Sequence, residues 1–402
     1  MVGRARCWQT AVLGFLAAMN FSCGGGNSAL TATPPNPKPA CEAASPPAFA
    51  YVLNDGDNTV SSYTVNSCTG NLLPTTPATV PTGANVFGSE QMVVDPAGRF
   101  AYVANLMSNA SDEATISMFT VDSSSGVLTP TTPATVPTGF FPQGIAIDPT
   151  GKFVYTANSD DNTVSMFTIN QTTGVLTATT PPAISTLADV STGLYSSPDA
   201  VTVHPLGKFA YAVNEDDGTV SMFTIDPTTG ILTSTTPATV FTGPIPFDIT
   251  VDPSGKFAYV PNNDSGGVMT YGISQYTVNP VTGVLTQNNP PAVAAGNGPT
   301  SVAVDPSSKF AYVVNRNDNT VSMFTIDPSS GNLTPNTPAI IATGEQPWRM
   351  TIDPSGKFAY VTNQDSDSIS IYSVNENGTL SAAGTAATGN NPVSVIITRT
   401  KE

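Results

Sequence analysis

The chain has 402 residues, of which 10% are charged, and its 29 acidic residues against 13 basic ones give a net charge of -16. Such a surface repels nucleic acid and anionic lipid headgroups, which argues against both as partners. A chain of this length can bury a large core, and few charges with abundant Thr, Ser and Asn are typical of an extracellular all-β protein.

Residues 1–23 have the pattern of an export signal. Arg4 and Arg6 precede an apolar run over residues 11–18, which is too short to cross a bilayer as a stable helix. Ser22 stands directly before Cys23, as at a bacterial lipoprotein cleavage site, so we predict lipidation of Cys23. We then expect an outer-membrane or cell-membrane lipoprotein that faces the periplasm or the cell exterior and touches the membrane only through its anchor. Because Asn20 stands where such sites usually carry leucine, plain secretion is the alternative.

Residues 24–48 are rich in Gly, Pro, Thr and Ala and predict a flexible tether. A tether of this length reaches roughly 25–30 Å on average. After cleavage at Cys23, the remaining cysteines are Cys41 and Cys68. A disulfide between them would pin the tether to the start of the folded domain, as suits an exported protein. Two unpaired thiols are the alternative.

A repeat decides the architecture of residues 49–402. Seven times a tyrosine in a strand-like context is followed three residues later by asparagine, with 48 to 56 residues between copies. This spacing is the size of one four-stranded propeller blade, and a blade must stack on its neighbours to bury both faces of its sheet. The seven pairs are Tyr51/Asn54, Tyr102/Asn105, Tyr155/Asn158, Tyr211/Asn214, Tyr259/Asn262, Tyr312/Asn315 and Tyr360/Asn363.

The sequence pattern of each repeat unit predicts four antiparallel strands. We name them A to D from the axis of the ring outward. In the sixth unit an apolar alternation ends at Asp305 and Pro306, and strands follow over 310–315, over 320–326 and around Leu333. Period-2 patterns bounded by turn residues continue along the chain, with no helical periodicity after residue 48. The chain starts its first unit at strand B, residues 49–53, and ends with a lone strand A, residues 393–398. We therefore predict a seven-bladed β-propeller in which the last strand completes blade 1 and closes the ring.

Several motifs are similar to those of a known family. They are Tyr-Val-Thr-Asn at 360–363, Asp-Pro-Ser-Gly-Lys-Phe-Ala-Tyr-Val at 252–260, and a repeated Thr-Gly-x-Leu turn. The chain resembles the YVTN-type propellers of the lactonase-like superfamily over residues 49–398. The resemblance implies the seven-bladed fold. It does not select an activity, because the superfamily includes phosphogluconolactonase-like enzymes as well as many cell-surface proteins without known activity.

Long insertions all fall on one face of the predicted ring, the loop face, which carries the B–C loops and the D–A connections. Acidic residues gather in the same B–C loops, so we predict an acidic surface there that binds a protein, a glycan or a small molecule. The alternative is that Asp and Asn cap the turns. Calcium is an alternative where two acids alternate, at Asp55/Asp57 and Asp365/Asp367, but neither stretch has the full spacing of a calcium loop, so we predict no metal and no cofactor. The loop acids are Asp55, Asp57, Asp112, Glu113, Asp160, Asp161, Glu215, Asp216, Asp217, Asp264, Asp318, Asp365 and Asp367.

A second set of residues stands at the axial end of strand A, just after the loop proline or its Ser89 counterpart, and differs from blade to blade. Here the candidate catalytic residues are Glu90, Asp199 and Asp248, as general bases for water, and Arg349, to hold a carbonyl or carboxylate oxygen. The alternative is a solvated channel mouth that simply holds polar residues. The candidate binding residues are Gln91, Gln143, Phe247 and Trp348.

Other catalytic sets are missing from the sequence. The lone histidine, His204, replaces the Asp of an Asp-Pro turn on the opposite face, and Arg316 and Arg349 are few bases for a phosphosugar. Our main prediction is a monomeric, surface-tethered binding or protein-interaction module, and the alternative is a lactonase-like hydrolase of a lactone or ester at the channel mouth. Two acids and Arg349 in one pocket would favour the enzyme, whereas a flat acidic rim would favour the partner surface.

Overall fold

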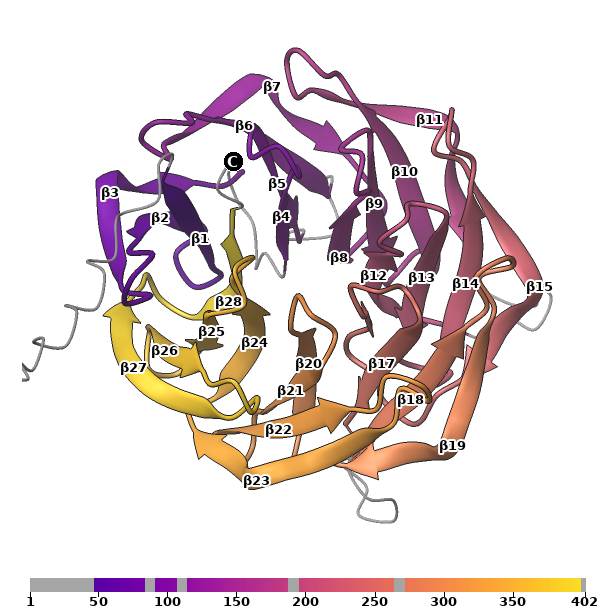
Figure 1. The fold of residues 1–402 in the computed structure, drawn as a ribbon. Coiled ribbons are helices and arrows are strands. Elements are labelled where there is room, and N and C mark those ends of the chain that lie inside the picture. The colour runs from indigo at the N-terminus through magenta and orange to yellow at the C-terminus, as the bar shows by residue number, and fades with distance from the viewer. Residues whose placement is uncertain (1–46, 84–90, 107–113, 187–194, 264–271, 399–402) are drawn as a thin grey trace, which may run out of the picture. The chain divides into compact units, whose positions relative to one another are not determined.

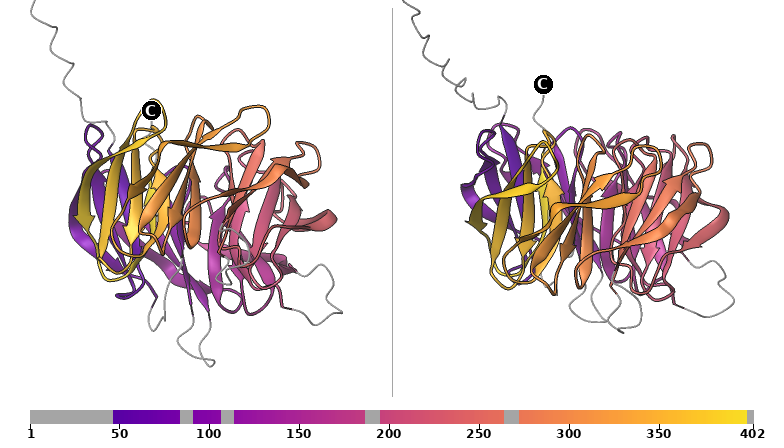
Figure 2. Two further views of the ribbon diagram at one scale, coloured as in Figure 1. Left: turned by 90° about the horizontal axis from the view of Figure 1, so that it is seen from below. Right: turned by 60° about the horizontal axis from the view of Figure 1, so that its bottom comes forward.

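The computed structural model describes residues 47–83, 91–106, 114–186, 195–263 and 272–398. These residues form 28 strands arranged as seven four-stranded antiparallel sheets, and they include no helix that could span a membrane. Figure 1 shows the seven blades around one axis, and in the edge-on views of Figure 2 the strands run from one face of the ring to the other. The predicted seven-bladed β-propeller is confirmed.

The strands of each blade, from the axis outward, have the following bounds. Blade 1 has β28 (Pro392–Ile397), β1 (Ala48–Asn54), β2 (Thr59–Val65) and β3 (Leu72–Pro81); blade 2 has β4 (Met92–Val94), β5 (Phe100–Asn105), β6 (Thr115–Val121) and β7 (Leu128–Pro137). Blade 3 has β8 (Pro142–Ile147), β9 (Phe153–Asn158), β10 (Thr163–Ile169) and β11 (Leu176–Ser185); blade 4 has β12 (Pro198–Val203), β13 (Phe209–Asn214), β14 (Thr219–Ile225) and β15 (Leu232–Phe241). Blade 5 has β16 (Thr250–Val251), β17 (Phe257–Asn262), β18 (Gly272–Val278) and β19 (Leu285–Ala294). Blade 6 has β20 (Pro299–Val304), β21 (Phe310–Asn315), β22 (Thr320–Ile326) and β23 (Leu333–Ala342); blade 7 has β24 (Pro347–Ile352), β25 (Phe358–Asn363), β26 (Ser368–Val374) and β27 (Leu380–Ala387).

The last strand closes the ring as predicted. β28 pairs antiparallel with β1, with Val395 opposite Val52. Beyond the strand, the Phe49 N–H donates to Thr398 Oγ1 at 2.9 Å. Blade 1 is therefore built from both ends of the folded chain, and neither end leaves a long unpaired strand edge.

The repeated tyrosines join neighbouring blades. Each hydroxyl donates a hydrogen bond of 2.7–3.0 Å to a glycine carbonyl in the C–D turn of the next blade, and Tyr360 makes this bond from blade 7 to Gly70 of blade 1. These glycines have positive φ, and a Cβ on Gly126 would lie 2.3 Å from the Phe49 ring of the preceding blade. The turn therefore requires glycine both for its backbone conformation and for close packing.

The repeated asparagines act within their own blades. Asn54 Nδ2 donates to Ser61 Oγ at 2.8 Å and to Thr59 Oγ1 at 3.0 Å, which ties the end of strand B to strand C. Asn158 makes the same pair of bonds to Ser165 and Thr163. Both halves of the Tyr/Asn repeat are thus structural, which explains why the repeat specifies the fold and is silent on activity.

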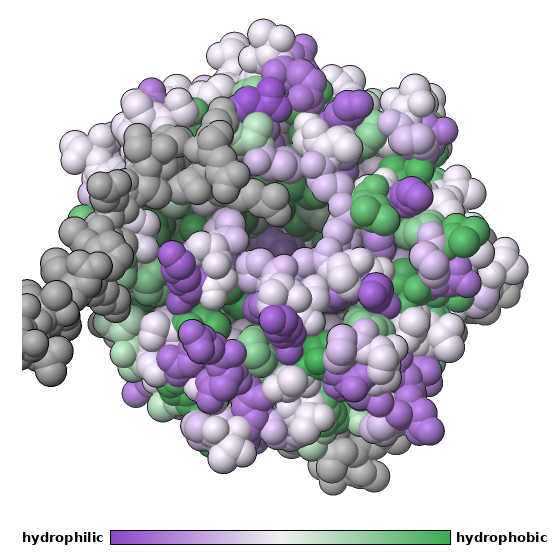
Figure 3. Space-filling view, viewed as in Figure 1, coloured by the Kyte–Doolittle hydropathy of each residue, from purple (hydrophilic) through white to green (hydrophobic). Residues whose placement is uncertain are grey.

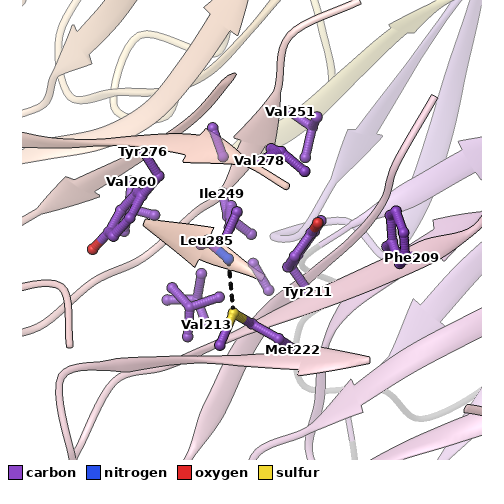
Figure 4. Packing of buried hydrophobic residues seen from close by; sticks show 13 residues of the cluster. Phe209, Tyr211, Val213, Met222, Ile249, Val251, Val260, Tyr276, Val278 and Leu285 are labelled. Carbon is purple, nitrogen blue, oxygen red and sulfur yellow. Dashed lines mark hydrogen bonds between the residues drawn. The ribbon is translucent and has the colours of Figure 1, made fainter. Parts of the chain in front are cut away.

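The hydrophobic core is divided among seven clusters, each shared between neighbouring blades. Figure 4 shows the cluster between blades 4 and 5, where Tyr211 and Met222 pack with Ile249, Val260 and Leu285. The Leu285 N–H also donates to the Met222 sulfur at 3.2 Å. Because the core lies between blades, the axis is free of it, and the centre of the ring is hollow in Figure 3.

His204 replaces a turn aspartate, as predicted. In blade 3, Asp148 accepts hydrogen bonds from the backbone N–H groups of Lys152 and Phe153. In blade 4, His204 Nδ1 instead accepts from the Leu206 N–H at 3.1 Å, and Nε2 lies 2.9 Å from the Gly255 carbonyl oxygen. With Nδ1 as acceptor, Nε2 carries the proton and donates it to Gly255, so the neutral ring links two A–B turns.

Several predictions concern residues outside the described part of the chain. These are the export signal with Cys23, the tether with Cys41, and the three long insertions of the loop face. Cys68 lies among the described residues, in the C–D turn of blade 1, whereas Cys41 does not. The pairing with Cys41 and the domain bounds at 23 and 48 therefore stay predictions.

Candidate functional site

A small polar cavity lies on the loop face at the axial ends of the strands. Its volume is about 150 Å³. Five consecutive blades, 3 to 7, contribute to its wall, so it lies at the axis of the ring. The lining residues are Gln143, Asp199, Glu215, Phe247, Thr300, Trp348 and Arg349.

A β-bulge explains why these side chains reach the cavity. In β12 the pairing with β13 shifts register between Pro198 and Ala200, which leaves Asp199 out of the ladder. The same shift leaves out Gln143 in β8, Thr300 in β20, and both Trp348 and Arg349 in β24. A bulged residue is released from the alternation of the strand and can be aimed elsewhere. The first residues of strand A therefore place a different type of side chain from each blade around the same cavity.

Two carboxyl groups meet in the cavity. The side chains of Asp199 and Glu215 are hydrogen-bonded to each other, and Asp199 is buried. Burial and the nearby charge of Asp216 raise the pKa of Glu215 above its ordinary value, although the bond to Asp199 opposes the shift. Two acids in contact cannot both ionise easily, so the pair tends to hold one proton between them. Such a pair can accept and return a proton.

Arg349 and two aromatic rings, Phe247 and Trp348, form another part of the cavity wall, and Arg316 packs on Trp348 outside the lining. Arg349 Nη1 lies 3.5 Å from Asp248 Oδ1, and the Arg316 guanidinium stacks 4.8 Å above the Trp348 ring. Phe247 meets the same ring edge-on at 6.0 Å. The Thr300 hydroxyl donates to the Trp348 carbonyl at 2.7 Å and fixes this strand end to blade 6.

Three buried N–H groups on this side have no hydrogen-bond partner within the described residues. They are Nε of Arg316, Nε of Arg349 and Nε1 of Trp348. Buried donors are nearly always paired in folded proteins, so a cluster of unpaired ones needs an explanation. Of these groups, Arg349 and Trp348 belong to the cavity wall, and the Arg349 charge makes this side suited to an oxygen atom of a ligand.

The structure places five of the predicted site residues in this cavity: Gln143, Asp199, Phe247, Trp348 and Arg349. Asp248 does not line it but pairs with Arg349. Gln91 also lies outside it, since its side-chain oxygen accepts from the Ile145 N–H and joins blade 2 to blade 3. Glu90 is outside the described residues.

Glu215 was predicted only as a loop acid, and Arg316 only as a base of the loop face. Each stands directly after the repeated asparagine at the end of strand B. That position lies beside the start of strand A: in blade 4, the Glu215 N–H donates to the Ser197 carbonyl at 3.0 Å. The sequence signal was present, because this position also differs from unit to unit.

Most loop acids that the structure describes hold loops together. Asp57, Asp161, Asp318 and Asp367 each accept a hydrogen bond of 2.7–2.8 Å from a backbone N–H of a D–A connection. This favours the turn-capping alternative over a flat acidic binding surface. The described residues also contain no group of three or more His, Cys, Asp or Glu side chains that could hold a metal ion.

Fold and site together define a closed seven-bladed propeller with a polar cavity at its axis. The family model described as "Lactonase, 7-bladed beta-propeller" matches residues 44–186, 180–289 and 284–397. The chain belongs to this family, which confirms the resemblance drawn from the repeat motifs. No curated protein matches the sequence closely enough to show a relationship.

Solved structures share the fold at low identity. A candidate 6-phosphogluconolactonase from Bacteroides uniformis has 23% identity and a TM-score of 0.73, over 87% of this chain and 99% of that one. The periplasmic gluconolactonase of Pseudomonas aeruginosa has 18% identity and a TM-score of 0.70, over 88% and 100%. Hydrazine synthase of Kuenenia stuttgartiensis has 20% identity and a TM-score of 0.55, over 80% and 94%. The fold thus carries more than one chemistry, and activity must be argued from the site.

Proposed function

We propose that the protein is a lactonase-type hydrolase that opens a small, uncharged lactone in the axial cavity. The observation that carries the proposal is the meeting of Asp199, Glu215 and Arg349 around one cavity. Membership of the lactonase family supports the hydrolase over the interaction module. The engagement of the loop acids in loop contacts supports the same choice.

The site residues suit each step of lactone hydrolysis. The ionised member of the Asp199–Glu215 pair takes a proton from water, and the water oxygen attacks the lactone carbonyl carbon. Arg349 holds the carbonyl oxygen as negative charge develops on it. The ring C–O bond then breaks, and the leaving ring oxygen takes the proton back from the carboxyl pair. The product is the open-chain hydroxy acid, and the enzyme returns to its starting state.

Size and charge limit the substrate. A volume of about 150 Å³ lies below the roughly 300–1,000 Å³ of sites for drug-sized ligands, which suits one small ring. With one proton shared by Asp199 and Glu215, these two acids and Asp248 carry about as much negative charge as the two arginines carry positive charge, so no surplus positive charge is left for a phosphate group. We therefore propose an unphosphorylated sugar lactone, in line with the gluconolactonase named among the similar structures.

Turnover of δ-gluconolactone by the purified mature protein tests this function, with acid release followed by a pH indicator. We expect hydrolysis above the spontaneous rate, and less activity on 6-phosphogluconolactone. Arg349→Ala should lower kcat/KM by roughly 100-fold or more, because a charge that stabilises the oxyanion is lost. Arg99→Ala is the matched control, since Arg99 also pairs with an aspartate but lies in an A–B turn. No turnover of any neutral lactone, or turnover indifferent to Arg349→Ala, would refute the proposal.

We also propose that the protein is exported and anchored through lipid on Cys23, with a Cys41–Cys68 disulfide that pins the tether. The support is the signal-like start of the sequence and the fact that Cys41 and Cys68 are the only cysteines after Cys23. Cys23→Ser should move the protein from the membrane fraction to the soluble fraction. Identical fractionation of mutant and wild type would rule out the lipid anchor and leave plain secretion.

A further inference from the structure

A second hollow of about 610 Å³ lies between the loops of blades 4 and 5. We call it the outer groove. Its wall includes Glu215, Asp216, Gly218, Phe241, Pro244 and Ile245. Glu215 also lines the axial cavity, so the two spaces have one lining residue in common. A ligand in the outer groove would lie next to the proposed catalytic pair.

The groove opens where the repeat loses a side chain. In three other blades the B–C loop ends in Asn or Asp with positive φ, and its side chain reaches the next D–A connection: Asn162 accepts from the Ser196 N–H, Asn319 from the Gln346 N–H, and Asp367 from the Asn391 N–H. In blade 4 this residue is Gly218, with φ of 63° and no side chain to fill the gap. The Thr242 N–H donates to the Gly218 carbonyl at 2.9 Å, so the backbone wall of the groove is held in place.

A second departure from the repeat faces the same groove. Phe241 ends strand D of blade 4 and is 62% exposed, although an exposed phenylalanine gains nothing from burial. The other six strands D end in small residues or proline at this position: Pro81, Pro137, Ser185, Ala294, Ala342 and Ala387. One missing side chain and one added ring therefore shape the groove.

We propose that the outer groove holds a glycosyl unit attached to the reacting lactone, so that the preferred substrate is the lactone of a disaccharide or longer sugar. The inference rests on the proposed function. The Phe241 ring offers a flat apolar face to the C–H face of a sugar, and the electron-rich face of an aromatic ring favours such contacts. Asp216 and Asp217 can accept hydrogen bonds from hydroxyl groups, since each carboxylate has about four acceptor positions.

Size and charge support this occupant. The groove has the volume of a typical small-ligand site, whereas the axial cavity has room for the reacting ring alone. Its lining has three acids and no base, which disfavours a phosphate or a carboxylate and leaves a neutral polyhydroxylated group. The groove and cavity share Glu215, which places them next to each other.

The test compares kcat/KM for cellobiono-1,5-lactone and δ-gluconolactone. Wild type should favour the disaccharide lactone by about tenfold, and Phe241→Ala should bring the ratio close to one by raising KM for the disaccharide. Ile340→Ala, which truncates an exposed apolar residue of blade 6, should keep the wild-type ratio. Gly218→Asn restores the repeat residue and should also reduce the ratio. Because a Cβ there would lie 2.7 Å from the Gly243 carbonyl oxygen, Phe241→Ala is the primary variant.

A binding measurement separates the two proposals. Isothermal titration with cellobionate, the open product, should show binding to wild type that Phe241→Ala weakens about tenfold. If cellobionate binds in this way while no lactone is hydrolysed, the groove stands and the hydrolase proposal fails. Equal kcat/KM for both lactones in wild type and in Phe241→Ala would overturn the proposal that the outer groove binds a glycosyl unit. The hydrolase proposal would remain. No turnover and no binding would overturn both.

Discussion

The contacts between blades and the residues at the axial ends of the strands follow opposite rules. Between blades, the same tyrosine donates to the same turn glycine seven times around the ring. At the axial ends, equivalent bulged positions carry Gln143, Asp199, Thr300 and Trp348. A closed ring needs the same contact between every pair of blades, whereas a functional site needs side chains of different kinds. In this repeat protein the departures from the repeat, rather than the repeat itself, point to function.

Removing the closing strand should have the largest effect on the ring. Deletion of residues 390–402 takes away β28, which exposes the edge of β1 and opens the core between blades 1 and 7. We expect loss of cooperative unfolding, or aggregation, in circular dichroism melts and size-exclusion chromatography. A truncated protein that melts like the wild type would contradict the closure.

Removing a single hydrogen bond between two blades should have an intermediate effect on stability. Tyr360→Phe removes the 2.9 Å bond to the Gly70 carbonyl across the closing junction and leaves a buried acceptor unpaired. The free energy of unfolding should fall by about 1–3 kcal/mol in urea titrations. Tyr195→Phe, at a tyrosine that is 67% exposed, should change it by less than about 0.5 kcal/mol. Equal effects of the two substitutions would mean that the inter-blade bonds do not stabilise the ring.

The A–B turn of blade 4, in which His204 replaces the usual aspartate, should make the free energy of unfolding slightly dependent on pH. Burial lowers the pKa of His204 below its ordinary value of 6.5. The unfolded chain therefore binds a proton more readily than the folded one, so stability is full above pH 6.5 and falls as the pH drops below it. Protonation would also place an N–H on Nδ1 against the Leu206 N–H.

His204→Asp restores the residue that the other described turns carry and should remove this component. The comparison is the change in unfolding free energy between pH 7 and pH 5 for the two proteins. The wild type should lose more than the variant. An identical pH dependence would show that the pKa of His204 is the same in the folded and the unfolded state.

The ring could be predicted from the sequence because the residues that join one blade to the next recur in every blade. The spacing of the Tyr/Asn pairs and the lone last strand were enough for the blade count and the closure. The sequence also placed Asp199 and Arg349 at the axis, since both follow the proline that starts strand A. Glu215 was missed as a site residue because it comes from the end of strand B, which the fold alone brings beside strand A. The outer groove could not be predicted either, since it depends on a side chain that Gly218 lacks.

In the hydrolysis that we propose, the Asp199–Glu215 pair moves the proton. The most direct test of this role is kcat/KM for δ-gluconolactone with Glu215→Gln, which keeps a hydrogen-bonding side chain but cannot share the proton. Glu376→Gln, the same change in an exposed C–D turn, is the matched control. We predict a loss of roughly 100-fold or more in Glu215→Gln, with a melting temperature within about 3 °C of wild type, and no loss in Glu376→Gln. Wild-type turnover by a folded Glu215→Gln protein would contradict the account.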